Sequence, residues 1–435
     1  MSAAAALVAL ALAAPAFPPV RTAAEQGALR DRVVRARADR LIGPAMKANG
    51  IGIWITLTRE DAPDPLVRLL TPDGTYPGSR NAYVFLEEGK ARATRVAVGS
   101  HQPPEAAGFW DEAVEARGDE VGARLRALAD RVPGPIAVNQ AEATPLADGL
   151  SASARAWLEG VLGPHAARLV SSERLVVDVL EPRLPEELPA WREAAAITRG
   201  LWETAFDRKL LVPGKTTVGD LVARLRERAA AQRVDLWFRP DFRVQRRGRA
   251  FDPGTPTGLE VVIEPGDLLH IDVGIVYAGL LSTDYQRMAY VPRAGERAPP
   301  PGLAAALAGT NRLQDLLGAE MRAGRTGPEV HEAAMKAASA AGLAAQIYSH
   351  SIGTSGHFVG AAIGSFRPGP GARPSLRATL PLRLGAGTAM ELNTKAAVPE
   401  WGGQEVYAME EDTTVLEPAG PRFLVPRQTA LYLVR

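Results

Sequence analysis

The chain has 435 residues, of which 46% are hydrophobic and 23% are charged, as in an ordinary globular protein. Its formal net charge is +1, so no strong overall field recruits nucleic acid or an anionic membrane surface. The absence of cysteine excludes disulfides, thiolate nucleophiles and zinc fingers, and leaves nitrogen and oxygen ligands for any metal. We therefore expect neither nucleic acid nor a membrane as a partner.

The amino terminus, MSAAAALVALALAAPAF, is a short apolar run that ends in Ala14-Pro15-Ala16. Such a run before an A-x-A site is typical of a secretory signal peptide, although no Lys or Arg precedes Arg21. We predict a signal peptide over residues 1–16 and a periplasmic or secreted protein; an uncleaved, Ala-rich helix end would instead indicate a cytoplasmic one. No later segment reaches about 18 uncharged apolar residues, the length of a membrane-spanning helix.

Strand and helix patterns alternate between residues 24 and 182. Residues 51–57 and 135–138 read as strands, residues 81–98 as a hairpin, and residues 111–132 as a helix. This alternation predicts an amino-terminal α/β domain. We find no phosphate loop, dinucleotide motif or catalytic cluster in it.

The composition breaks at EPRLP, and residues 183–435 read as a second domain. Helices are predicted over 189–210 and 217–234, the latter with Thr217 as N-cap and Asp220 three residues later. PGKTTVGDLVARLRERAAA resembles AGRTGPEVHEAAMKAASA further along, where Gly-(Lys/Arg)-Thr again precedes a helix. The repeat predicts two helix-helix-strand units with pseudo-twofold symmetry and a site where their strands converge.

Polar residues occupy apolar, strand-like segments of this second domain. An isolated ionised carboxylate is costly to bury, and four of them close together repel strongly unless divalent cations neutralise them. Each residue alone is more often a hairpin end or a solvated edge than a metal ligand, so the set carries the prediction. Oxygen-rich ligands with one imidazole suit Mn²⁺, Co²⁺ or Zn²⁺, and we predict two ions bridged by shared carboxylates. The candidate ligands are Asp272, Asp284, His350, Glu391 and Glu410.

The motifs IDVG, TDYQR, HSIGTSGH, AMELN and MEEDTTV contain these residues in the order Asp, Asp, His, Glu, Glu. In this order, residues 185–435 resemble the pita-bread metallopeptidases, which include aminopeptidase P, prolidase, methionine aminopeptidase and the metal-free creatinase. The resemblance is strongest to exported bacterial Xaa-Pro peptidase-like proteins. It implies a creatinase-N-like α/β domain over 24–182 and an α+β pita-bread catalytic domain over 183–435.

The resemblance also implies a role for each ligand. Asp272 is expected to bind one metal ion, and His350 and Glu391 the other. Asp284 and Glu410 are expected to bridge both ions. Manganese is the expected metal, with cobalt or zinc as alternatives.

His357 matches the family histidine that hydrogen-bonds the scissile carbonyl and its tetrahedral intermediate. The implied reaction is hydrolysis of an amide by a metal-bridging hydroxide, with Glu391 accepting and relaying the proton. We therefore predict a hydrolase that acts on peptides, an Xaa-Pro aminopeptidase or dipeptidase. The family also implies a homodimer.

The match departs from the family pattern in two places. The two aspartates are 12 residues apart, whereas eleven is common in the family, so a bulge or a longer turn within GLLST is expected. The usual substrate-binding histidine upstream is missing from RVQRRGRAFDPGTPTG. His270 shares a strand face with Asp272 and is either its substitute in binding substrate, a supporting group or a core residue.

Trp401, before the last ligand strand, is expected either to stack on a substrate proline or to pack in a tight turn. Two other functions stay open. One is a creatinase-like hydrolase of another C–N bond, and the other is a non-catalytic peptide-binding protein.

Overall fold

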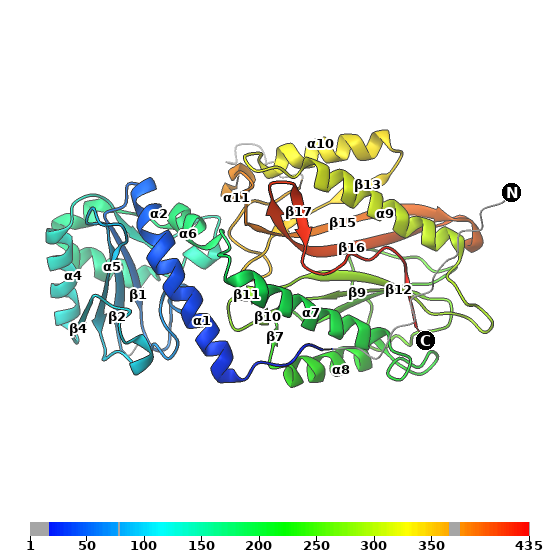
Figure 1. The fold of residues 1–435 in the computed structure, drawn as a ribbon, viewed down its shortest axis with the longest axis horizontal. Coiled ribbons are helices and arrows are strands. Elements are labelled where there is room, and N and C mark those ends of the chain that lie inside the picture. Colours follow the sequence, from blue (N-terminus) through cyan, green and yellow to red (C-terminus); the bar gives the residue numbers. More distant parts are fainter. Residues whose placement is uncertain (1–16, 77–78, 365–374, 435) are drawn as a thin grey trace.

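The computed structural model describes residues 17–76, 79–364 and 375–434. The predicted signal peptide lies outside these residues. Figure 1 shows a smaller region, drawn in blue and cyan, beside a larger one, drawn in green to red. Among the described residues, no helix has the length and apolar character needed to cross a membrane. The domain boundary predicted at residue 182 falls between α6 (Glu173–Leu180) and α7 (Glu187–Phe206).

The amino-terminal region is built on a mixed sheet with the strand order β4-β3-β2-β1-β5-β6. Its strands are β1 (Ile53–Thr58), β2 (Asn81–Leu86), β3 (Thr94–Gly99), β4 (Glu112–Glu115), β5 (Ile136–Val138) and β6 (Leu169–Ser171). Its main helices are α1 (Ala23–Arg37), α2 (Gly43–Ala48), α4 (Asp119–Arg131) and α5 (Ala152–Leu162). The helix predicted over 111–132 begins only at Asp119, because β4 pairs in parallel with β3 and takes up the preceding residues.

The larger region is built on a sheet whose main path runs β13-β15-β16-β12-β9-β8. These strands are β8 (Asp241–Gln245), β9 (Leu268–Val273), β12 (Tyr285–Tyr290), β13 (Ala344–Ile347), β15 (Gly387–Val398) and β16 (Gln404–Glu417). Shorter strands are β14 (His350–Ser351), β17 (Gly420–Phe423) and β18 (Tyr432–Leu433), which pair with β15, β16 and β12. A small separate sheet contains β7 (Asp235–Leu236), β10 (Ile275–Tyr277) and β11 (Leu281–Ser282).

The predicted repeat appears as two helix pairs, each followed by strands of the larger sheet (Figure 1). The first pair is α7 and α8 (Val218–Ala231), and the second is α9 (Pro301–Glu320) and α10 (Gly327–Ala340). The second helix of each pair begins with a capping box, Thr217 with Asp220 and Thr326 with Glu329. Because β12 pairs with β16, the strands of the two units form one continuous sheet.

A buried ion pair lies on the face of this sheet that the helices cover. Arg287 in β12 lies 2.5 Å from Asp412 in β16, and both side chains have no exposed surface. Gln314 of α9 donates to the other oxygen of Asp412 at 2.8 Å, and the guanidinium of Arg287 stacks over Trp202 of α7. Side chains alternate along a strand, so the neighbours of Arg287 and Asp412 point to the opposite face.

Replacing Arg287 with Met should leave Asp412 buried without its cation. We expect the free energy of unfolding to fall by about 3–5 kcal/mol, the usual cost of removing one partner of a buried pair. Urea denaturation of metal-free protein measures the change. Lys395→Met is the matched control, since Lys395 is half-exposed and pairs with exposed Glu405; it should change stability by about 1 kcal/mol or less. Equal effects of the two variants would contradict this assignment.

Candidate metal centre

One row of polar side chains crosses the open face of the sheet. In the strand register Asp272 lies opposite Gln286, Gln286 opposite Glu411, and Glu411 opposite Glu391. Directly opposite residues of antiparallel strands point to the same face, with Cβ atoms about 4.5–5.5 Å apart. Strands from both repeated units thus bring three carboxylates together.

Two overlapping groups of side chains could each hold a metal ion. In the first group, Asp272, Glu391 and Glu411 offer oxygens that lie within 4.8 Å of one another. In the second, Asp284, His350 and Glu411 do the same. His350 Nε2 lies 3.3 Å from Glu411 Oε1 and 3.7 Å from Asp284 Oδ2. Glu411 belongs to both groups and joins them.

The prediction that Glu410 belongs to this cluster is wrong, and Glu411 takes its place. Adjacent residues of a strand point to opposite faces, so Glu410 shares the helix-covered face with Asp412. The side chain of Glu410 is fully buried, and neither carboxyl oxygen has a partner among the described residues. The motif MEEDTTV contains two adjacent glutamates, and the pairing of Glu411 with Glu391 decides which one faces the cluster.

The other four predicted ligands converge as expected, although Asp272 and Asp284 are separated by a longer connection than is common in the family. Ala278 and Gly279 both have positive φ, 52° and 64°, and form the turn between β10 and β11. The pairing of β10 with β11 continues the register of β9 with β12. The turn between β10 and β11 therefore absorbs the extra residue, and the strands do not slip.

The two histidines of HSIGTSGH lie side by side at one end of the cluster. His350 Nδ1 lies 3.2 Å from the carbonyl oxygen of Ser351. That contact suits a proton on Nδ1 and leaves the Nε2 lone pair facing the carboxylates. The exposed ring of His357 packs edge-to-face on His350, with centroids 4.4 Å apart, and so reaches the open side of the centre.

An indole that the sequence analysis did not single out supports three segments of the centre. Trp237 donates from Nε1 to the carbonyl oxygen of Thr283, the residue before Asp284, at 3.1 Å. Its ring centroid is 5.5 Å from that of His357. A Cβ added at Gly274 or Gly356 would lie 2.0 or 2.1 Å from this indole, so both positions require glycine.

His270 supports the centre indirectly, through Gln286. Its side chain has no exposed surface, so it is not placed to contact a substrate. His270 Nε2 lies 3.0 Å from Gln286 Oε1, and Gln286 donates to Glu391 at 2.5 Å and to Glu411 at 3.2 Å. Burial lowers the pKa of His270 to about 3, so the neutral ring donates to Gln286, which in turn orients two carboxylates.

Trp401 does not line the centre. It is 5% exposed and packs in a core cluster with Leu303, Val398 and Val406. The packed-turn alternative for Trp401 is therefore correct, and the predicted stacking on a substrate proline has no support in the structure.

The electrostatics of the centre call for a cation. Burial, with the charge of neighbouring carboxylates, raises the pKa of Asp272 to about 7 and that of Glu391 to about 8. The same causes raise the pKa values of Asp284 and Glu411 well above their ordinary range. Within the described part of the chain, Asp272 Oδ1, Asp284 Oδ1 and Glu411 Oε1 are buried without a hydrogen-bond donor. Divalent cations would satisfy these oxygens, and the donor set fits Mn²⁺, Co²⁺ or Zn²⁺.

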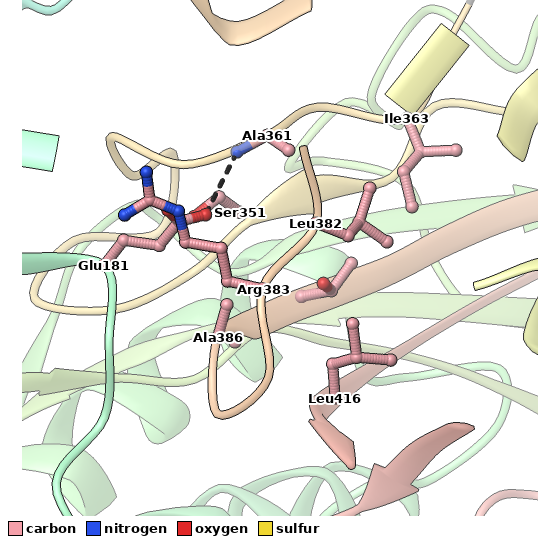
Figure 2. A pocket seen from close by; sticks show the side chains of 10 residues that line it. Glu181, Ser351, Ala361, Ile363, Leu382, Arg383, Ala386 and Leu416 are labelled. Atoms are coloured by element: carbon pink, nitrogen blue, oxygen red, sulfur yellow. Dashed lines mark hydrogen bonds and ion pairs between the residues drawn. The ribbon is translucent and has the colours of Figure 1, made fainter. Parts of the chain in front are cut away.

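A separate, small cavity is lined in part by Ser351, the residue after His350 (Figure 2). Its volume is about 10 Å³, close to the smallest that holds one water molecule, so it is not a substrate pocket. Glu181, at the end of α6, lines it and accepts from the backbone N–H of Ala361 at 3.4 Å. Glu181 also lies 3.3 Å from Arg383. These contacts hold the segment that follows His357.

With this geometry established, comparison with known proteins defines the class. A family model matches residues 190–416 to metallopeptidase family M24. The match covers more than half of the chain, and the chain belongs to this family. A search of curated proteins found no match. The protein is a metal-dependent peptidase by family, and its pita-bread catalytic domain follows an α/β domain in the chain.

Solved structures share the fold over almost their whole length. X-Pro aminopeptidase from Thermotoga maritima is 16% identical, with a TM-score of 0.65 over 90% of this chain and 99% of its own. Dipeptidase PepE from Mycobacterium ulcerans is 19% identical, with a TM-score of 0.62 over 94% and 98%. Xaa-Pro dipeptidase from Bacillus anthracis is 18% identical, with a TM-score of 0.61 over 95% and 100%.

The two neighbouring glutamates should differ sharply in metal binding. We expect Glu411→Gln to weaken binding by more than the ~10–100-fold typical of a supporting residue, because it removes a ligand common to both groups. Glu410→Gln should retain metal, since Glu410 points to the other face. Calorimetric titration of metal-free protein with Mn²⁺ measures both affinities. Loss of binding in Glu410→Gln, with binding retained in Glu411→Gln, would show that Glu410 is the ligand and Glu411 is not.

The metal-free protein should become less stable as the pH rises. A carboxyl group with a raised pKa keeps its proton in the folded state at pH values where the unfolded chain has lost it. Unfolding therefore releases protons, and the free energy of unfolding falls as the pH rises. Stability should therefore fall from about pH 4, where unfolded carboxyls titrate, through the pKa values of about 7 for Asp272 and about 8 for Glu391.

Bound metal replaces these protons, so the increase in melting temperature on adding Mn²⁺ should grow between about pH 5 and pH 8. Thermal unfolding with and without Mn²⁺ at each pH provides the measurement. An increase that does not depend on pH would show that the carboxylates do not carry this proton linkage.

Proposed function

We propose that the protein is a dinuclear metallo-exopeptidase that hydrolyses Xaa-Pro bonds, as an aminopeptidase or a dipeptidase. The observation that carries the proposal is the pair of ligand groups joined by Glu411. Asp272 and Glu391 would hold one ion, Asp284 and His350 the other, and Glu411 both. Manganese is the proposed metal. The Xaa-Pro preference is supported by the named activities of proteins that share the fold.

Two divalent ions at these groups would supply positive charge that polarises the substrate carbonyl and acidifies a water molecule. The protein residues then divide the remaining work. Glu391 is partly exposed, and its raised pKa suits a carboxylate that accepts a proton and passes it to the leaving amine. His357, exposed beside His350, is placed to donate to the carbonyl oxygen as negative charge develops on it.

Assays of the metal-loaded protein test this function. Ala-Pro and an Ala-Pro-initiated tripeptide, each compared with the corresponding Ala-Ala peptide, separate dipeptidase from aminopeptidase activity and measure the need for proline. Hydrolysis that requires Mn²⁺, Co²⁺ or Zn²⁺ and favours the proline peptides is expected. Two bound equivalents of metal without turnover of any peptide would indicate a peptide-binding protein instead.

Replacing His357 with Ala should lower kcat by about 10²–10³-fold, the usual loss when one donor to a developing oxyanion is removed. Metal affinity should stay unchanged, because His357 belongs to neither ligand group. Steady-state kinetics with a parallel measurement of bound metal checks both expectations. The control is His331→Ala, whose imidazole lies on α10, outside both groups. A kcat equal to that of the unaltered protein would remove His357 from the reaction.

A further inference from the structure

The polar row extends one strand further than the metal centre. Asp241, the first residue of β8, lies directly opposite Asp272 in the register. Its side chain therefore shares the open face with the ligands and follows Asp272 in the row. Yet Asp241 belongs to neither group of candidate ligands. Asp241 therefore lies beside the metal centre and not within it, on β8, which is the last strand in the order of the larger sheet.

Asp241 keeps an acceptor free. Its Oδ2 lies 3.1 Å from Arg243, two residues along the same strand. Its Oδ1 is buried and has no hydrogen-bond partner among the described residues. The side chain is 14% exposed, so part of it is still accessible from the open face. Arg243 thus compensates the charge of Asp241 and fixes its position while one oxygen stays unsatisfied.

The free acceptor suits a cation better than any other ligand. A buried carboxylate oxygen is strongly stabilised by a charged donor, and an anion would be repelled by Asp241 and Asp272 together. In a peptide, the α-ammonium group is separated from the first carbonyl carbon by the α-carbon alone. A carbonyl held at the centre therefore brings the ammonium group of the same residue close to the neighbouring strand.

We propose that Asp241, held by Arg243, binds an ammonium group of the substrate's amino-terminal residue and thereby restricts cleavage to the first peptide bond. This inference rests on the proposed peptidase function. It gives Asp241 the role of a specificity residue, which the upstream segment was expected to supply through a histidine. The group bound is the α-ammonium, because only this group marks the amino terminus of every peptide.

The test compares paired substrates in the metal-loaded protein. Alanyl-proline is paired with propionyl-proline, which lacks the α-amino group, and lysyl-proline with norleucyl-proline, which lacks the side-chain amine. The ratio of kcat/KM within a pair does not depend on how much enzyme is folded or loaded with metal. It is measured for the unaltered protein, for Asp241→Asn and for the control Asp235→Asn, an exposed aspartate of β7.

We expect Asp241→Asn to lower the preference for the amine in the alanine pair by about 10-fold or more, as for the loss of a hydrogen bond between charged groups. A fall in the lysine pair alone would show that Asp241 binds a side chain and would contradict the inference. Asp235→Asn should leave both ratios unchanged. Ratios that stay the same in Asp241→Asn would overturn the inference.

The same comparison can be made without turnover. Calorimetric titration uses reduced-amide analogues of alanyl-proline and propionyl-proline, in which a methylene replaces the scissile carbonyl. The unaltered protein should bind the amine-bearing analogue more tightly, and Asp241→Asn should lose about 10-fold or more of that preference. If the unaltered protein hydrolyses no peptide, the proposed function fails. If it hydrolyses the peptides but Asp241→Asn keeps its amine preference in both measurements, only the present inference fails.

Discussion

Negative charge inside the catalytic sheet must be compensated, and this constraint organises the rest of the site. Asp272, Glu391 and Glu411 lie on strands of the two repeated units, Asp284 directly precedes β12, and the four carboxylates converge. In an apolar interior their mutual repulsion would oppose the pairing of the two units. Burial and this repulsion raise the pKa values of Asp272 and Glu391, so without a cation these groups keep their protons at a higher pH. Divalent cations bound at these groups would relieve this repulsion, so that assembly of the sheet and formation of the centre would depend on the same charges.

The two faces of β16 show two solutions to the same electrostatic problem. On the helix-covered face, Asp412 is compensated permanently by Arg287 and by a hydrogen bond from Gln314. On the open face, Glu411 accepts a hydrogen bond from the amide of Gln286 and lies beside the ring of His350, and no arginine or lysine is paired with it among the described residues. A fixed guanidinium stabilises the sheet, whereas a bound ion on the open face would leave room for water and substrate. In the proposed function, consecutive residues of β16 therefore take a structural and a chemical role.

Much of this centre could be predicted from the sequence, because carboxylates in apolar strands are rare enough to be informative. Asp272, Asp284 and Glu391 are each the only carboxylate in their motif, and these residues and His350 converge on the centre. The prediction of Glu410 is wrong, because a motif with two adjacent glutamates does not reveal which of them faces the centre. That choice depends on pairing with β15, a contact between distant parts of a hairpin.

The aromatic residues of the site could not be predicted for a related reason. A tryptophan near a ligand strand in sequence can lie on either side of the sheet, and Trp401 packs in the core. Trp237 lies far upstream of the histidine segment, and only the folded chain brings it against His357. Asp241 likewise lies in no recognisable motif, and only the pairing of β8 with β9 places it opposite Asp272.

The contacts of Glu181 couple the orientation of the two regions to the reactive side of the enzyme. This carboxylate ends the last helix before α7 and holds the backbone just beyond His357. No amino-terminal side chain belongs to the two ligand groups. Glu181 nevertheless contacts the chain four residues after His357, so a change in the angle between the two regions would strain the segment that carries this imidazole.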